Sequence, residues 1–216
     1  MCYQTRLIKK REEIMQRFNA EMNELLDYSP VEFCSAFDYP STPVITDERP
    51  QDIQFFNWGL VPDWSQDIFV RKYTLNARIE TLHEKKSFKS VINNRCLIIA
   101  DGFYEWQWVT KSGSKKNKYL ITVPDEGLFG FAGIYSKWLD FEGNIFNSYS
   151  IITTEANELM SEIHNTKKRM PVILKKEDEY AWLKGRSVEE FKYPYEIELE
   201  ARALNNPDDH QLTLFN

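Results

Sequence analysis

The sequence has few of the residues that build metal sites and no run typical of membrane or secreted proteins. Its three cysteines form no CxxC pair and its three histidines are scattered, so a structural zinc site is not expected. No metal or other cofactor is predicted. No apolar run approaches the length that spans a bilayer, so we expect no membrane partner. The amino-terminal stretch MCYQTRLIKKREE has no apolar signal core, and we therefore expect a cytoplasmic protein.

The chain also has no excess of basic residues. It carries 27 lysines and arginines against 33 acidic residues, a net charge of -6. This balance argues against broad, non-specific binding to nucleic acids, although a local basic groove stays possible. Hydrophobic residues make up 42% of the 216 positions and aromatic residues 14%, which is typical of a globular protein with one large core or two small ones.

Several strands are predicted to follow one another with only polar turns between them. We expect strands at residues 95–100, 118–123, 129–138 and 148–154. This succession argues for an antiparallel or mixed sheet that closes toward a barrel. The remaining expectations are a helix over 8–26, loops with short extended pieces over 30–50, a helix opened by Thr153 or Thr154, a helix over 178–183 and a late strand over 193–198.

These elements together predict an α+β protein. We expect a single β-rich domain over residues 1–200, with a barrel-like sheet and peripheral helices, followed by a flexible tail over 201–216.

The stretch from Arg95 to Trp106 contains the first candidate for chemistry. An apolar run suits a strand buried on both faces, and Asp101-Gly102 breaks it as a turn or bulge would. Glu105 then stands among large aromatic residues. If Glu105 is buried, its charged form is disfavoured and it can donate and accept protons near neutral pH. Alternatively, Glu105 faces solvent while its aromatic neighbours pack, as for most acidic residues in strands.

Cys2 directly follows Met1, and a small residue at this position favours removal of the initiator. The product would carry an α-amine, which titrates near neutrality, and a thiol on one carbon skeleton. Such a pair can condense with an aldehyde to an imine and then close to a thiazolidine ring. The alternative is an ordinary residue at a frayed terminus.

The segment NARIET carries three polar side chains at alternating positions. In a strand, Asn76, Arg78 and Glu80 would face one side. Arg78 could bind a phosphate through both of its NH groups, with Glu80 holding it from behind. Trp64 is expected to be exposed, where it could stack on a base, or else to lie in a loop packed on the core. His164 ends the apolar stripe of an expected helix, in a structural or a chemical role.

Five motifs resemble, in their order along the chain, the SOS response-associated peptidase (SRAP) family, also called abasic-site processing proteins. They are Met1-Cys2, WGLVPDW, NARIET, GFYEW and IHN followed by RMPVIL, and they span residues 1 to about 183. The resemblance implies a β-rich, barrel-like single domain that needs no cofactor. It also implies covalent capture of an abasic site in single-stranded DNA by the amino-terminal cysteine, and hence a DNA-repair protein acting at the nucleoid.

The resemblance implies a role for each residue that matches a motif. Cys2 would be the nucleophile after removal of Met1, a step the family is thought to catalyse itself as a peptidase. Asn76 would position the terminal amine, and Glu105 would shuttle protons during ring opening and closure. His164 would assist opening of the sugar ring and reversal of the crosslink, a possible lyase activity.

On the DNA side, the resemblance implies phosphate binding by Arg78, with Trp64 and Arg169 along the same groove. Family members commonly begin Met-Cys-Gly-Arg, whereas Tyr3-Gln4 stands here, so Arg6 is the candidate for the missing phosphate contact. The Tyr-Asn-x-Ala-Pro loop of the family corresponds to residues 37–40, which makes Pro40 a candidate DNA contact. The usual His-x-Arg-Met-Pro spacing is lengthened by residues 165–168.

The tail carries a separate hypothesis, because it lies outside this resemblance. It ends in a short run behind a polar spacer, namely Gln211, Leu212, Thr213, Leu214 and Phe215. The run resembles the Gln-Leu-x-Leu-Phe peptide by which bacterial repair and replication proteins bind the sliding clamp. A flexible tether that presents apolar anchors and one amide to a preformed pocket suits such binding. The alternative is a short terminal strand docked on the sheet.

Three functions stay open at this point. The first is a repair enzyme that crosslinks abasic sites, which calls for a phosphate groove near Arg78 and Arg169. The second is a peptidase or amidohydrolase that uses Cys2 on an amide and needs an oxyanion hole. The third is a non-covalent single-strand-binding adaptor that recruits the clamp, for which Cys2→Ser would keep all function.

Overall fold

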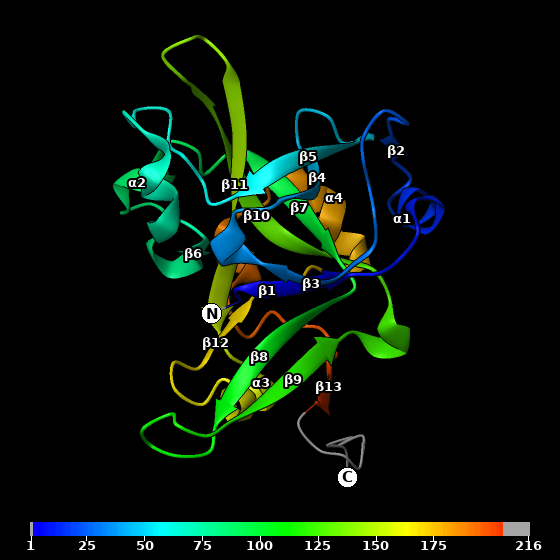
Figure 1. The fold of residues 1–216 in the computed structure, drawn as a ribbon, viewed down its shortest axis with the longest axis vertical. Coiled ribbons are helices and arrows are strands. Elements are labelled where there is room, and N and C mark those ends of the chain that lie inside the picture. Colours follow the sequence, from blue (N-terminus) through cyan, green and yellow to red (C-terminus); the bar gives the residue numbers. More distant parts are fainter. Residues whose placement is uncertain (1, 205–216) are drawn as a thin grey trace.

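The computed structural model describes residues 2–204, apart from the side chain of Glu126 (Figure 1). Its centre is a closed barrel of five strands, whose neighbouring members are antiparallel except where β11 pairs in parallel with β5. In order around the barrel these are β5 (Asp52–Trp58), β4 (Ser41–Thr46), β7 (Arg95–Ala100), β10 (Phe129–Leu139) and β11 (Ile145–Glu155). The predicted α+β class with a mixed, barrel-like sheet is confirmed.

Short strands extend this sheet on two sides. β2 (Glu21–Met22) pairs with β5, while β6 (Asn76–Arg78) and β12 (Arg169–Pro171) both pair with β11. β6 runs parallel to β11 and β12 antiparallel, and both pair with the end of β11 at Thr153. The end of β11 therefore brings together two segments that lie about 90 positions apart in the sequence.

A second sheet lies beside the barrel. Its strands follow the order β13 (Glu200–Ala203), β9 (Lys116–Thr122), β8 (Gly102–Trp108), β1 (Gln4–Leu7) and β3 (Val31–Ser35). Figure 1 shows the β8–β9 hairpin projecting below the barrel, with β1 and β3 between them. A single residue, Asp101, separates β7 of the barrel from β8 of the second sheet, so the predicted break in this stretch is confirmed.

The helices are short and peripheral. The α-helices are α1 (Arg11–Phe18), α2 (Lys86–Lys89), α3 (Glu158–Ile163) and α4 (Glu179–Leu183). The 3-10 helices are η1 (Ala36–Asp38), η2 (Ile68–Tyr73), η3 (Ile79–Thr81), η4 (Pro124–Glu126), η5 (Lys176–Asp178) and η6 (Val188–Phe191). None of the helices within residues 2–204 is long and apolar enough to cross a membrane.

The core is built on both faces of β7. All six residues of this strand are buried, as its apolar run predicts. Cys96 and Ile98 join one hydrophobic cluster, whereas Leu97 and Ile99 join the other, because successive strand residues point to opposite faces. Gly133 on β10 is packed so closely that a Cβ there would lie 2.9 Å from the sulfur of Cys96. The centre of the barrel therefore has no room for a larger residue at this position.

The expected helix over residues 8–26 is wrong in length. α1 ends at Phe18, because Asn19 adopts a left-handed conformation (φ 47°) and turns the chain into β2. Met22 continues the apolar spacing of the helix, yet it is buried from a strand. The same spacing of apolar residues thus comes from two elements.

Three further expectations need correction. Thr153 and Thr154 end β11, and the cap of α3 is Asn157, whose side-chain oxygen accepts from the Met160 amide at 2.9 Å. The late strand is β13, not residues 193–198, and it continues past residue 200. Residues 30–50 hold two complete strands, β3 and β4.

A buried ion pair joins β1 to the junction between β7 and β8. The Nε of Arg6 donates to Oδ1 of Asp101 at 2.8 Å, and the amide of Ile8 donates to Oδ2 at 2.7 Å. Arg6 is 3% exposed and Asp101 is fully buried. The adjoining Gly102 leaves space for the Arg6 side chain, since a Cβ there would lie 3.3 Å from Nε. The pair therefore fixes the first strand against the second sheet.

We predict that Asp101→Asn lowers the free energy of unfolding by about 3–5 kcal/mol, because it removes the buried carboxylate that balances the Arg6 charge. Urea denaturation followed by circular dichroism measures this change. The control is Asp52→Asn, which disrupts the exposed pair with Arg49 and should cost less than about 1 kcal/mol. Equal losses in the two variants would contradict the structural role of Asp101.

Candidate active site around Cys2

Cys2 lies immediately before β1 and is completely buried. The side-chain amide of Asn76 donates to its carbonyl oxygen at 2.8 Å. Asn76 reaches this position because β6 runs beside β11, where Asn76 is paired with Ile151. Burial raises the pKa of the Cys2 thiol far above its ordinary value, and the negative charge of Glu105 raises it further. The thiol is therefore protonated at neutral pH.

Glu105 points into the protein from β8 and is 5% exposed. Its neighbours Tyr104 and Trp106 lie on the other face of the strand, where Lys118 Nζ sits 4.2 Å and 5.6 Å from their ring centroids. The interpretation in which Glu105 faces solvent is thus wrong. Burial raises the pKa of Glu105 to about 7, so the carboxyl group exists in both protonation states near neutral pH.

His164 caps the carboxyl end of α3 and is 7% exposed. Its Nδ1 lies 2.8 Å from the carbonyl oxygen of Arg169. Burial lowers the pKa of His164 to about 4, so the ring is neutral at pH 7. α3 packs against β8, and Asn165 exchanges hydrogen bonds of 2.9 and 3.1 Å with the backbone of Trp108. His164 therefore lies beside the strand that carries Glu105.

The expected DNA contacts on the barrel side are accessible. Arg78 ends β6 with an exposed side chain, and Pro40 is partly buried just after η1. Trp64 is 43% exposed, as expected, and the Nζ of Lys86 lies 4.2 Å from its ring centroid. In Figure 1, β6 and α2 lie on the same side of the molecule as the amino terminus. An aromatic face and a guanidinium are thus available on one side of the site.

The sequence analysis missed an aromatic pair beside Cys2. The rings of Tyr3 and Phe37 lie 5.0 Å apart, and Phe37 is 60% exposed. Close by in the chain, Arg71 covers the ring of Tyr39 at 3.9 Å. The replacement of the family's usual glycine by Tyr3 was the one available signal, because stacking partners from distant segments leave no local pattern.

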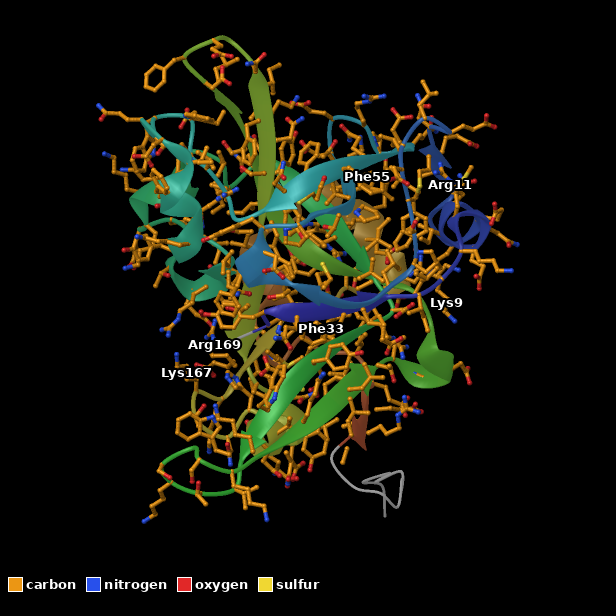
Figure 2. All side chains as sticks on the ribbon, in the orientation of Figure 1. Lys9, Arg11, Phe33, Phe55, Lys167 and Arg169 are labelled. Atoms are coloured by element: carbon orange, nitrogen blue, oxygen red, sulfur yellow. The ribbon has the colours of Figure 1, made fainter. Side chains whose placement is uncertain are left out.

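Arg6 is not a phosphate contact, because its guanidinium is buried against Asp101. Glu80 does not hold Arg78, since it lies beyond the strand in η3 and both of its oxygens accept from Arg169 at 2.7 and 2.9 Å. Arg169 is itself buried and also donates to the carbonyl oxygen of Thr153 at 2.7 Å. These bonds turn the Arg169 guanidinium into the protein, although it lies on the expected side (Figure 2).

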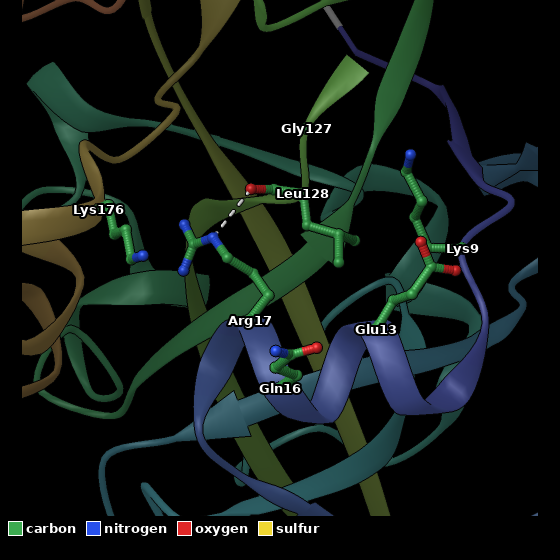
Figure 3. Close-up of a pocket in the computed structure, with 7 residues that line it drawn as sticks. All are labelled: Lys9, Glu13, Gln16, Arg17, Gly127, Leu128 and Lys176. Carbon is green, nitrogen blue, oxygen red and sulfur yellow. Dashed lines mark hydrogen bonds between the residues drawn. The ribbon is translucent and has the colours of Figure 1, made fainter. Parts of the chain in front are cut away.

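A hollow of about 480 Å³ lies beside α1, away from these residues (Figure 3). Its lining residues include Lys9, Glu13 and Arg17. The Nε of Arg17 donates to the carbonyl oxygen of Leu128 at 3.2 Å, and its two NH groups donate to Glu179. The arginine of this hollow is therefore committed to structural bonds, and none of the residues singled out from the motifs lines it.

Two further expectations concern absent or undescribed groups. No three histidine, cysteine or acidic side chains within the described part of the chain are placed to hold a metal ion. The clamp-binding residues Gln211, Leu212, Leu214 and Phe215 lie outside the described residues.

We predict that Glu105→Gln stabilises the protein at pH 8. The pKa of Glu105 is 4.5 as a reference value and about 7 when folded, so the stability of the wild type falls as the pH rises through this interval. Glutamine carries no charge to bury, and the variant should be more stable by about 1–3 kcal/mol at pH 8 and equal at pH 4. Urea titrations across this pH range test the prediction, with exposed Glu84→Gln as the control. Identical pH profiles for wild type and Glu105→Gln would refute it.

Comparisons with known proteins agree with this geometry. A family model described as SOS response associated peptidase (SRAP) matches residues 1–206. The chain is 37% identical over 193 residues to the abasic site processing protein YoqW of Bacillus subtilis (strain 168), covering 88% of this chain and 83% of that protein. It is 30% identical over 196 residues to the abasic site processing protein HMCES of Rattus norvegicus, covering 71% and 54%. A crystal structure of a Bacteroides thetaiotaomicron protein superposes with a TM-score of 0.84 at 34% identity, covering 95% and 93%. The chain belongs to the SOS response associated peptidase family.

Proposed function

We propose that this chain processes abasic sites in single-stranded DNA by bonding them covalently to Cys2 after removal of Met1. The names of the relatives support this substrate class, since YoqW and HMCES are both called abasic site processing proteins. The observation that carries the proposal is the 2.8 Å hydrogen bond from Asn76 to the Cys2 carbonyl oxygen. This bond holds in place the residue whose backbone amine becomes the nucleophile.

The amine, not the thiol, makes the first attack. The buried thiol of Cys2 is protonated at neutral pH, whereas an α-amine titrates near pH 8 and is partly unprotonated. The Oδ1 of Asn76 is buried and has no hydrogen-bond partner among the described residues. It is therefore available to accept a hydrogen bond from the amine of Cys2 and to orient its lone pair.

The crosslink forms in two bond-making steps. The open-chain form of the abasic sugar presents an aldehyde, and the Cys2 nitrogen adds to its carbon to give a carbinolamine that loses water to an imine. The Cys2 sulfur then adds to the imine carbon, and its proton reaches the imine nitrogen through Glu105. One water leaves overall, and a thiazolidine ring remains. A carboxyl group with a pKa of about 7 suits both transfers, because it donates and accepts at the same pH.

The remaining site residues act on the sugar and the strand. His164 assists opening of the sugar ring and, in the reverse direction, release of the crosslink as a lyase. Arg78 binds a backbone phosphate, while Trp64 offers a face on which a base stacks. Removal of Met1 is hydrolysis of the amide before Cys2, and it is the peptidase step of the same site.

A denaturing gel tests the proposal. The protein, with Met1 removal confirmed by intact mass, is incubated with a single-stranded oligonucleotide that contains one abasic site. We expect a heat-stable shifted band for the wild type and no band for Cys2→Ala. Cys34→Ala is the matched control and should keep the band, because Cys34 lies on β3 outside the site. Glu105→Gln should slow band formation by about 100-fold or more.

Absence of the band from wild-type protein that has lost Met1 would contradict the proposal. Cleavage of an amide substrate by that protein would then favour a Cys2 peptidase or amidohydrolase. Salt-sensitive binding to the strand that survives in Cys2→Ser would instead favour a non-covalent adaptor.

We also propose that the tail binds the bacterial sliding clamp, on the basis of the sequence from Gln211 to Phe215. The double change Leu214→Ala and Phe215→Ala removes two apolar anchors and should weaken binding to purified clamp more than about tenfold. Fluorescence anisotropy with labelled full-length protein measures the affinity. Thr213→Ala, at the variable position of the peptide, should bind normally. Unchanged affinity of the double variant would sink the clamp hypothesis.

A further inference from the structure

We propose that Glu80 and Arg169 are positioning residues that fix His164 in the tautomer with the proton on Nδ1, so that Nε2 is its proton acceptor. The importance of this tautomer for the reaction rests on the proposed function. The tautomer itself is a property of the folded chain and can be measured without DNA.

The contacts of Nδ1 decide the tautomer. Nδ1 lies 2.8 Å from the carbonyl oxygen of Arg169 and 3.2 Å from the amide nitrogen of the same residue. A carbonyl oxygen only accepts hydrogen bonds, so the shorter contact is favourable only when Nδ1 carries a proton. Two lone pairs facing each other at 2.8 Å would repel. The neutral ring then has its free lone pair on Nε2.

A tight turn brings the Arg169 peptide to the ring. The amide of Lys168 donates to the carbonyl oxygen of His164 at 2.9 Å, and Lys168 adopts a left-handed conformation (φ 47°). The preceding Asn165 is bonded to the backbone of Trp108, which anchors the turn to the end of β8. The ring of His164 is thus oriented by a peptide group from its own segment.

The Arg169 side chain holds that peptide group in place. Its two NH groups bind the two oxygens of Glu80 at 2.7 and 2.9 Å, and one of them also binds the Thr153 carbonyl oxygen at 2.7 Å. A fork of this kind fixes the plane of the guanidinium as well as its distance. Glu80 follows directly after β6, so the same segment that carries Asn76 also supports His164. This assignment also explains why Arg169 faces inward and not toward a phosphate.

The Nδ1–H tautomer gives His164 one direction of proton transfer. When the abasic sugar opens, the hydroxyl proton of the hemiacetal passes to Nε2 and the bond from the anomeric carbon to the ring oxygen breaks. The ring oxygen takes a proton from the Glu105 carboxyl group and becomes a hydroxyl group. The aldehyde is formed, and the two protons balance. The opposite tautomer would present an N–H to the hemiacetal and could not accept its proton.

Nuclear magnetic resonance of the histidine rings tests the assignment. The chain has three histidines, so long-range proton–nitrogen correlations of protein labelled at the imidazole nitrogens give three ring patterns, and His164→Gln identifies one. At pH 7 we expect a protonated Nδ1 and an unprotonated Nε2 for His164. In Glu80→Gln we expect the other tautomer to gain population and the crosslinking rate to fall about tenfold, which corresponds to about 1.4 kcal/mol.

The pair of Arg17 and Glu179 provides a matched control. It is also a partly buried fork, with distances of 2.8 and 3.0 Å, but it lies beside α1. Glu179→Gln should lower the unfolding midpoint as much as Glu80→Gln does and should leave the His164 pattern and the crosslinking rate unchanged. Arg169→Lys retains the charge without the fork and should shift the tautomer in the same direction. It carries the test if Glu80→Gln does not fold.

The inference is overturned if wild-type His164 carries its proton on Nε2. It is also overturned if folded Glu80→Gln or Arg169→Lys keeps the wild-type pattern and rate. If the expected tautomer is present but the wild type forms no crosslink, the proposed function fails while the positioning of His164 stands.

Discussion

The buried pair of Arg6 and Asp101 is the contact on which the geometry of the site depends. Asp101 stands where the chain leaves the barrel for the second sheet, and it bonds the first strand at that point. Cys2 lies just before this strand, and Glu105 lies four residues after the junction. One ion pair therefore sets the position of the nucleophile relative to the group that moves its protons. Because the pair is buried, its loss weakens both the fold and the site.

The end of β11 organises the other half of the site. β6 approaches it from one side with Asn76, and β12 approaches it from the other with Arg169. This arrangement places an amide on the Cys2 carbonyl and supports His164 from behind. The site is thus assembled from elements of both sheets, while its reactive groups are held out of water. Burial that raises the pKa of Glu105 costs stability and makes the carboxyl group useful near neutral pH.

Local signals in the sequence were sufficient for most strands but not for the contacts between them. The apolar run at residues 95–100 and its flanking break became β7 and the turn into β8, because length and turn residues are local properties. The face of Glu105 could not be assigned, since only the packed fold tells which side of a strand is covered. The partnership of Arg6 with Asp101 joins positions 95 apart, and no short pattern encodes it. Met22 misled for a similar reason, because a buried strand residue continued the spacing of a helix. The motifs therefore identified candidate residues, while their partners required the structure.

The most direct test of the central claim is the chemical structure of the adduct. Protein that has reacted with an abasic oligonucleotide is digested with nuclease and protease, and the amino-terminal peptide is sequenced by mass spectrometry. The account predicts a peptide that begins at Cys2 and carries the sugar remnant with the loss of one water. Its thiol should also resist alkylation, because the sulfur is part of the ring. A remnant attached to a lysine, or a Cys2 peptide whose thiol is still alkylated, would contradict the account.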